Sequence, residues 1–205
     1  MALLIVRHGE TALNVARTVQ PADTPLSERG WAQARLLADR LAASQRVVAI
    51  VSSDLPRAAQ TAQAVAARLG LPLHEDARLQ ERNFGRWRGL PYDGLGFDPL
   101  RTEQAPPDGE SLADFRHRVA LAFDRLRDRL ACLDGDLLVV THGLVIRALF
   151  EQHLALAPGQ IVPEHLANTS LTVVGGESGC QVALAACAAH LAGEQAPGTG
   201  QIAGI

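Results

Sequence analysis

The sequence contains no lysine, since all 19 of its lysine or arginine positions are arginine. Two classes of enzyme depend on a lysine side chain. A P-loop nucleoside triphosphatase contacts phosphate with one, and a Schiff-base enzyme uses its amine as the nucleophile. The absence of lysine excludes both classes.

Cysteine is also scarce. Cys132, Cys180 and Cys187 are odd in number and none has the CxxC spacing, so neither a disulfide framework nor a zinc site is indicated. We expect buried, reduced thiols. Five histidines likewise lack metal-ligand spacing, and we expect structural roles for them: His74, His117, His153, His165 and His190.

A strong charge imbalance and long apolar runs are both absent. The formal net charge of -3 gives no electrostatic case for binding nucleic acid or an anionic membrane. The opening apolar run, residues 1–6, is far shorter than a signal or membrane segment, and no later run approaches the roughly 18 residues of a membrane span. We therefore expect a cytoplasmic protein whose partner is a small molecule.

What the sequence does have is material for a core, because 47% of its 205 residues are hydrophobic. Short runs rich in Val, Ile and Leu occur at residues 3–6, 47–51 and 137–140. Each is too short for a helix and is followed by polar residues, which is typical of buried parallel strands. Residues 171–174 and 181–187 predict a terminal hairpin across the sequence GGESG.

Helical patterns lie between the predicted strands. After a candidate cap at Ser27, apolar residues recur at helical spacing up to Leu41, and residues 58–69 are rich in alanine. Ser111 and Asp114 have the spacing of a capping box before a third apolar stripe. This alternation predicts an α/β fold, a three-layer sandwich around a mostly parallel central sheet.

The domain organisation is simple, because no internal repeat is present. We predict a single domain over residues 1–188. Residues 189–205 are rich in Gly, Ala and Gln without periodicity, and we expect them to form a flexible tail.

Polar residues of related chemistry follow the predicted strands. The first strand ends at Arg7 and His8, the second leads to Arg57 in the first turn of a helix, and the third ends in His142 and Gly143. Ligands bind open α/β sheets beyond the carboxyl ends of the strands, where helices begin. Arginine, histidine and helix amides gathered there form an anion site, and phosphate is the expected ligand.

A carboxylate stands in a fourth stretch, LQERNFGRWRG at residues 79–89. Glu81 has no evident packing role among its aromatic and glycine neighbours. A carboxyl beside a phosphate pocket is suited to donate a proton. The alternative is that Glu81 pairs with its neighbour Arg82.

Six segments of the sequence, taken together in their order along the chain, point to a protein family. They are LLIVRHGET followed by Asn14, DTPLSERGWAQA, SSDLPRAAQTA, LQERNFGRWRG, PPDGESLADFRHRV and VVTHGLVIRAL. Together they resemble the histidine phosphatase superfamily, in the branch that contains phosphoglycerate mutases and small bacterial phosphatases. The likeness runs from residue 1 to about residue 174.

The resemblance implies catalysis through a phosphohistidine. His8 would attack phosphorus with one ring nitrogen while a backbone carbonyl holds the other, and Glu81 would exchange a proton with the leaving group and with water. For Asn14 a helix cap is nearly as simple an explanation. No metal or other cofactor is implied, because arginine and histidine hold the phosphate in this family. The implied phosphate-binding residues are Arg7, Asn14, Arg57, His142 and Gly143.

Half of the chain's aromatic residues lie between residues 84 and 97. Either they form a lid over the leaving group, or they form a small core beneath a loop. We place the lid at about residues 83–110, with Phe84, Trp87, Tyr92 and Arg88 as substrate contacts. Arginines in this region either bind a substrate carboxylate or are solvated surface residues: Arg86, Arg88 and Arg101.

These features predict a metal-independent phosphomonoesterase that acts on a small phosphorylated metabolite. Phosphoglycerate mutases of the family carry a longer insertion after the glutamate segment, with paired arginines. In this chain only residues 90–107 separate the glutamate segment from the DGES sequence, and they contain no Arg-Arg pair. This difference favours hydrolysis, and a mutase is the alternative. A binding module without catalysis is less well supported, because the whole catalytic set is present. Dimers are common among relatives, but no exposed stripe decides the oligomeric state.

Overall fold

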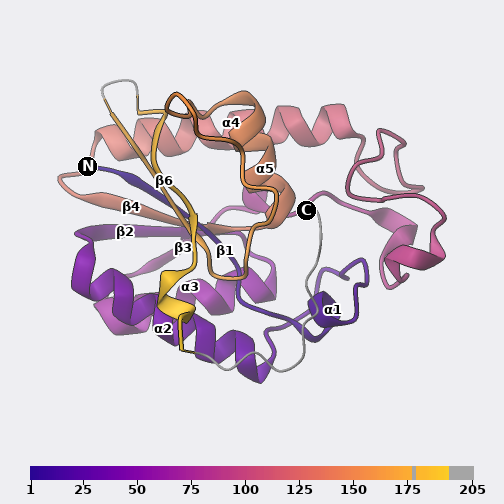
Figure 1. Cartoon of the computed structure of the whole chain (residues 1–205), viewed down its shortest axis with the longest axis horizontal. Coiled ribbons are helices and arrows are strands. Elements are labelled where there is room, and N and C mark those ends of the chain that lie inside the picture. The colour runs from indigo at the N-terminus through magenta and orange to yellow at the C-terminus, as the bar shows by residue number, and fades with distance from the viewer. Residues whose placement is uncertain (177–178, 194–205) are drawn as a thin grey trace.

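A six-stranded sheet runs through the centre of the protein (Figure 1). The computed structural model describes residues 1–176 and 179–193. The strands are β1 (Leu3–Arg7), β2 (Val47–Ser52), β3 (Leu73–Glu75), β4 (Asp136–Thr141), β5 (Leu171–Gly175) and β6 (Gln181–Cys187). Their spatial order is β3-β2-β4-β1-β5-β6, parallel from β3 to β1 and antiparallel at β5 and β6. The predicted mostly parallel sheet is confirmed.

Helices cover both faces of this sheet, with α2 (Glu28–Ser44) and α3 (Pro56–Leu69) on one face (Figure 1). On the other face lie α4 (Leu112–Ala131) and α5 (Gly143–Gln152), while α1 (Ala12–Val15) is a single turn outside the layers. The predicted three-layer sandwich is confirmed. Within the described ranges, no helix has both the length and the apolar character needed to cross a membrane.

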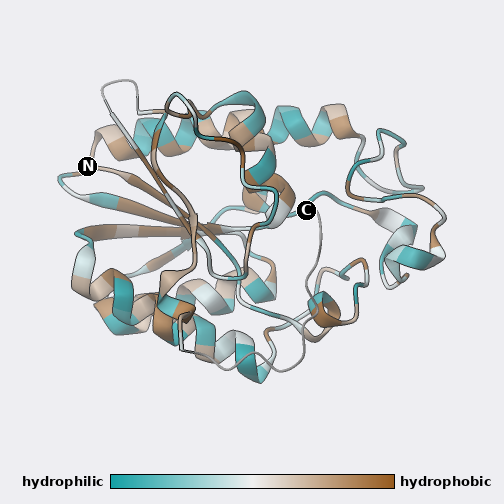
Figure 2. Ribbon diagram, in the orientation of Figure 1, coloured by the Kyte–Doolittle hydropathy of each residue, from teal (hydrophilic) through white to brown (hydrophobic). Residues whose placement is uncertain are grey.

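The protein has two hydrophobic cores, one on each face of the sheet, and the alternation of side chains along β1 contributes to both. Leu3 and Ile5 pack with residues of α4 and α5, whereas Leu4 and Val6 pack with residues of α2 and α3. All four side chains are fully buried. Because successive residues of a strand point to opposite faces, an unbroken apolar run marks a strand buried on both sides. Figure 2 shows these central strands as largely hydrophobic, while the helices carry hydrophilic residues as well.

The predicted helix caps are present. The Ser27 hydroxyl accepts the N–H of Gly30, and the Ser111 hydroxyl accepts that of Asp114, both at 3.0 Å. α3 begins at Pro56, two residues before the predicted alanine-rich stretch, because proline fits the first turn, where no N–H is needed.

The C-terminal part agrees with the sequence prediction in its hairpin and differs in its tail. β5 and β6 pair as predicted, and residues 177–178 of the connecting turn lie outside the described residues. Ala189–Leu191 form a 3-10 helix instead of the start of a flexible tail. Hydrogen bonds hold it, because His190 lies 3.1 Å from an Arg40 nitrogen and 3.0 Å from the Thr169 hydroxyl. Residues 194–205 of the predicted tail lie outside the description.

The three cysteines form no disulfide bond, and they are less buried than predicted. Cys132 is exposed at the C-cap of α4, and Cys180 and Cys187 are partly exposed. The expectation of buried thiols is therefore wrong, most clearly at Cys132, because a helix terminus faces solvent there.

Candidate active site

The carboxyl ends of β1 and β4 meet at one edge of the sheet and bring two predicted motifs together. Arg7 lies opposite Thr141 in the parallel pairing, so His8 and His142 follow side by side. The N–H of His8 donates to the Thr141 carbonyl at 2.9 Å, and the two imidazole centroids are 5.2 Å apart. This is the edge at which open α/β sheets bind ligands.

Hydrogen bonds fix the orientation of the His8 ring. Nδ1 lies 2.7 Å from the carbonyl oxygen of Gly9, so Nδ1 carries the proton and Nε2 keeps its lone pair. The Gly9 N–H donates to Thr61 Oγ1 at 2.9 Å. Glycine is needed here because a Cβ would lie 2.7 Å from the Gly30 carbonyl oxygen. Burial, assisted by nearby arginines, holds the pKa of His8 well below its usual value, which keeps the ring neutral at pH 7.

Two buried arginines stand beside His8 with part of each guanidinium unsatisfied. Arg7 donates through one terminal nitrogen to the Leu166 carbonyl, and Arg57 similarly to the Pro21 carbonyl. The Nε of each has no hydrogen-bond partner in the described residues. Burial lowers the pKa of Arg57 to about 10, so it stays charged at neutral pH. Because buried unpaired cations are costly, these groups indicate an anionic ligand.

His142 and Gly143 begin α5 at the same edge. His142 Nε2 lies 2.8 Å from Ser53 Oγ, and that oxygen also accepts the N–H of Leu55. In the tautomer in which the Ser53 hydroxyl donates its proton to Nε2, the ring proton lies on Nδ1. Nδ1 is buried and unpartnered in the part of the chain described. Burial lowers the pKa of His142 well below its usual value, so this ring is also neutral.

Asn14 is a helix cap and a pocket residue at once. In the capping box of α1, Thr11 Oγ1 accepts the Asn14 N–H at 3.0 Å, and Asn14 Oδ1 accepts the Thr11 N–H at 3.1 Å. Oδ1 also accepts a hydrogen bond from Asn168 Nδ2 at 3.3 Å. Because Oδ1 is occupied, the amide nitrogen of Asn14 is its group for a ligand in the pocket that it lines.

Glu81 lines the same pocket, as does Gly143. One carboxylate oxygen accepts the N–H of Arg82 at 3.0 Å, and the other accepts that of Leu144, in the first turn of α5, at 3.2 Å. Burial raises the pKa of Glu81, although both hydrogen bonds and the nearby arginines act in the opposite direction. A raised pKa suits a carboxyl that must hold a proton before it donates one.

The Arg82 side chain does not pair with Glu81. Its guanidinium donates to the backbone carbonyls of Thr102, Gln104 and Glu110 at 2.9 to 3.1 Å. Only 1% of its surface is exposed. The alternative of a simple Glu81 and Arg82 ion pair is therefore wrong, and Arg82 instead holds the far end of the predicted lid.

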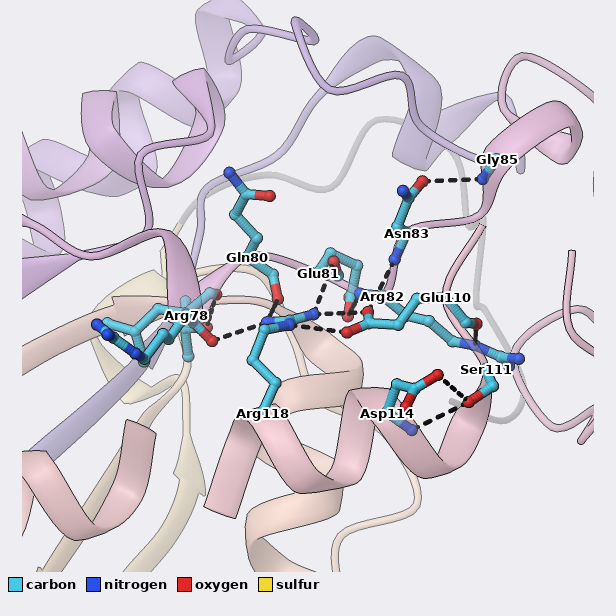
Figure 3. A network of polar contacts seen from close by, with 12 residues as sticks. Arg78, Gln80, Glu81, Arg82, Asn83, Gly85, Glu110, Ser111, Asp114 and Arg118 are labelled. Carbon is cyan, nitrogen blue, oxygen red and sulfur yellow. Dashed lines mark hydrogen bonds and ion pairs between the residues drawn. The ribbon is translucent and has the colours of Figure 1, made fainter. Parts of the chain in front are cut away.

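A second arginine, Arg118 of α4, holds the segment that carries Glu81 (Figure 3). It donates to both carboxylate oxygens of Glu110, at 2.7 and 2.8 Å. It also donates to the carbonyls of Gln80 and Glu81, at 2.8 and 3.4 Å. Glu110 in turn accepts the N–H of Asn83 at 3.2 Å. The network thereby ties the chain on both sides of Glu81 to one helix.

The predicted lid contains residues that line the pocket and residues that pack beneath it. Phe84, Arg88 and Tyr92 line the pocket, and their contact with a substrate stays a prediction. Trp87 lies instead in the hydrophobic core, where its ring meets Phe97 edge to face with centroids 4.9 Å apart. The structure therefore places Trp87 as a support of the lid and not as a substrate contact.

The three lid arginines have different surroundings. Arg86 pairs with Asp108 at 2.6 Å and Arg101 pairs with Asp98 at 3.5 Å, and all four side chains are well exposed. Arg88 lines the pocket, and its Nε is buried without a hydrogen-bond partner among the described residues. Arg86 and Arg101 are thus surface arginines, whereas Arg88 is not.

Sequence reasoning missed several residues of the site. Gln20 lines the pocket, and its Oε1 accepts the Thr11 hydroxyl at 3.1 Å. Asn168 donates to the His8 carbonyl at 3.0 Å. Ser53 lies inside SSDLPRAAQTA, one of the segments that carry the family resemblance, so its place in that segment could have marked it as a site residue. Gln20 and Asn168 lie outside all six segments, and only the fold brings them to the site.

The unpartnered groups of this site are N–H donors of arginine and histidine: Arg7, Arg57, Arg88 and His142. Across residues 1–176 and 179–193, no group of three or more His, Cys, Asp or Glu side chains is arranged to hold a metal ion. Donors of this kind bind anions such as phosphate or carboxylate.

The chain belongs to the histidine phosphatase superfamily (branch 1), whose family model matches residues 3–187. The predicted family is confirmed, and the protein is an enzyme of the histidine phosphatase type. It is 37% identical over 184 residues to phosphoglycerate mutase-like protein 4 of Arabidopsis thaliana, which covers 83% of this chain and 77% of the plant protein.

Solved structures of both phosphatases and mutases are similar to this chain. A mycobacterial glucosyl-3-phosphoglycerate phosphatase in complex with VO3 is 31% identical, with a TM-score of 0.72 over 88% of this chain and 94% of that one. The phosphoglycerate mutase of Bacillus anthracis strain Sterne is 27% identical, with a TM-score of 0.80 over 94% and 95% of the two chains.

Proposed function

We propose that this protein is a metal-independent phosphomonoesterase that hydrolyses a small phosphorylated metabolite through a phosphohistidine on His8. The observation that carries the proposal is the state of the His8 ring. It is neutral, its Nδ1 proton is held by the Gly9 carbonyl, and its Nε2 is free beside two unsatisfied guanidinium groups. A nucleophilic imidazole needs this arrangement.

In the first step, His8 Nε2 forms a bond to phosphorus as the bond from phosphorus to the ester oxygen breaks. The departing alkoxide takes the proton of the Glu81 carboxyl and leaves as an alcohol. Glu81 suits this role because burial raises its pKa and two backbone N–H groups fix its orientation.

In the second step, water attacks the phosphohistidine and gives its proton to the Glu81 carboxylate. The bond between Nε2 and phosphorus breaks, inorganic phosphate leaves, and His8 and Glu81 return to their starting protonation states. One carboxyl group therefore serves as acid and then as base.

Fixed donors stabilise the charge on the transferred phosphoryl group. The Nε groups of Arg7 and Arg57 and the Nδ1 of His142 lack protein partners in the residues described, so they are available to its oxygens. The side-chain amide of Asn14 and the backbone N–H of Gly143, two residues that line the pocket, are further donors to these oxygens. Phosphoryl transfer depends mainly on such positioning and charge stabilisation.

A phosphoglycerate mutase is the second candidate, because similar proteins are named as a phosphoglycerate mutase, a probable one or a mutase-like protein. Such an enzyme returns the phosphoryl group to a phosphoglycerate before water reaches it. The short segment between the glutamate and the DGES sequence favours hydrolysis, since little chain is available to close over the intermediate.

The test is an incubation of purified protein with 3-phosphoglycerate, glycerol 3-phosphate and a panel of sugar phosphates, in chelator without added metal. Inorganic phosphate and 2-phosphoglycerate are both followed, and the His8→Ala variant is the control. Phosphate released by the wild type alone supports the proposal. Formation of 2-phosphoglycerate without phosphate would establish the mutase, and tight ester binding without turnover at any pH would indicate a binding module.

A further inference from the structure

Arg88 is a cation in the pocket that the proposed reaction leaves unused. It lines the pocket beside Arg57 and Glu81. Its Nε is buried and has no hydrogen-bond partner among the described residues. Arg82 lines the same pocket, but three backbone carbonyls satisfy its guanidinium. The contrast indicates that Arg88 is held available for a ligand.

The backbone on both sides of Arg88 is fixed. The Arg88 N–H donates to the Gly85 carbonyl at 3.2 Å, and the Gly89 N–H donates to the Val19 carbonyl at 2.7 Å. The Val19 N–H donates to the Leu90 carbonyl at 2.9 Å. The side chain therefore extends from an anchored turn, which reduces the entropy lost when it binds a ligand.

The positive charges of the pocket outnumber the negative charges of a phosphate monoester. Four arginines line the pocket, and one of them, Arg82, interacts electrostatically with the Glu110 carboxylate. The other three, Arg7, Arg57 and Arg88, carry three positive charges, and each has an Nε without a hydrogen-bond partner in the described residues. Arg88 is near enough to Arg57 to contribute, after burial, to the lowering of that group's pKa. A phosphate monoester dianion balances two of these charges, and Glu81 is neutral when it acts as the acid. One guanidinium charge is left for a further anionic group on the substrate.

We propose that Arg88 binds a carboxylate on the leaving group, so that the enzyme prefers phosphomonoesters of carboxylic acids. This inference rests on the proposed function. A carboxylate matches the single remaining charge, whereas a second phosphate would bring two. The planar guanidinium also fits the two oxygens of a carboxylate with paired hydrogen bonds.

The test compares kcat/KM for 3-phosphoglycerate and glycerol 3-phosphate, which differ in a carboxylate against a hydroxymethyl group. We expect the wild type to prefer 3-phosphoglycerate, and the Arg88→Gln variant to lower that preference by roughly 10- to 100-fold. Arg86→Gln is the matched control, because Arg86 lies in the same turn, exposed and paired with Asp108. It should keep the wild-type preference.

Three results would overturn the inference. Equal losses on both esters in Arg88→Gln would place Arg88 on the transferred phosphate. A wild type without preference would show that no carboxylate is bound. A stronger preference for a bisphosphorylated ester, lost in the same variant, would assign the subsite to phosphate.

A binding measurement separates failure of the proposed function from failure of the carboxylate subsite. It uses the His8→Ala variant, which does not consume the ester. If the wild type releases no phosphate but His8→Ala binds 3-phosphoglycerate more tightly than glycerol 3-phosphate, the hydrolase proposal fails and the subsite stands. The further change of Arg88 to Gln must then abolish the difference in Kd. If the difference persists, the subsite is refuted as well.

Discussion

The two ends of the pocket are held in place by different means. At the phosphate end, Arg7 closes β1, and His8 and His142 follow directly from central strands whose backbones are fixed by the parallel ladder. At the lid end, the regular structure of residues 83–110 consists of short 3-10 helices and one isolated bridge between Thr18 and Pro91. Scattered backbone hydrogen bonds, such as those to Val19, and side chains such as Arg82 hold this segment in place. The strand topology therefore sets the phosphate end, whereas individual backbone and side-chain hydrogen bonds set the end that contacts the leaving group.

This difference makes the two ends separable by experiment. A residue at the phosphate end contacts the group that every ester shares, so its loss should affect all substrates alike. A residue at the lid end acts on the leaving group, so its loss should depend on what that group is.

The largest of these effects is expected for Arg57→Gln. The variant should lower kcat/KM by roughly 10²- to 10³-fold on glycerol 3-phosphate and on p-nitrophenyl phosphate alike, because a charged donor to the transferred oxygens is lost. Arg68→Gln is the control, since Arg68 is exposed on the same helix and paired with Asp39. A loss confined to one ester would remove Arg57 from the phosphate end.

Glu81→Gln should separate the substrates. Turnover of glycerol 3-phosphate should fall by about 10² or more, because its alkoxide needs a proton. Turnover of p-nitrophenyl phosphate should fall much less, since p-nitrophenolate leaves without one. Steady-state rates on both esters provide the measurement, and equal losses would contradict the acid role.

The pH dependence should show the same division. His8 must be neutral, and because its pKa is lowered, activity should be lost only as the pH falls through that low value. Glu81 must be protonated, and because its pKa is raised, activity on alkyl phosphates should be lost as the pH rises through the raised value. The alkaline loss should be weaker for p-nitrophenyl phosphate. Profiles of kcat/KM that coincide for the two esters would count against Glu81 as the acid.

Arg118→Met should have a smaller effect that still depends on the leaving group. Without the bonds to Glu110 and to the Gln80 carbonyl, the Glu81 carboxyl loses its fixed position, and we expect roughly 10-fold lower kcat on glycerol 3-phosphate with less change on p-nitrophenyl phosphate. Arg125→Met, an exposed change on the same helix, is the control. A variant that is less stable to urea yet has an unchanged ratio of the two rates would limit Arg118 to a role in folding.

The smallest effect is expected for Phe97→Ala. Phe97 supports the lid through its edge-to-face contact with Trp87, and such pairs contribute about 0.5 to 1.5 kcal/mol. The KM for alkyl phosphates should rise a few-fold with kcat nearly constant. A large fall in kcat would mean that the lid takes part in the chemistry itself.

The position of the residues at the phosphate end is easier to predict from the sequence, because its signals are local. An unbroken apolar run such as Leu3–Val6 marks a strand buried on both faces, and the residues after it must lie at the sheet edge. Caps such as Ser27 and Ser111 also act within a few residues.

The lid end is harder to predict because its contacts are long-range and lack periodicity. Arg82 and Arg118 bind backbone carbonyls 20 or more residues away, and any residue type supplies a carbonyl. Trp87 and Arg88 are neighbours in the sequence, yet one packs in the core and the other lines the pocket. The ordered turn around His190 depends in the same way on Arg40, far earlier in the chain.

The most direct test of the central claim is to trap the intermediate. Wild-type protein and the His8→Ala variant are mixed with substrate, quenched with alkali within the first turnover, digested and examined by mass spectrometry. We predict an acid-labile, alkali-stable phosphate on the His8 peptide of the wild type and none in the variant. Phosphate release at the wild-type rate without that modification, or with the label on another residue, would contradict the account.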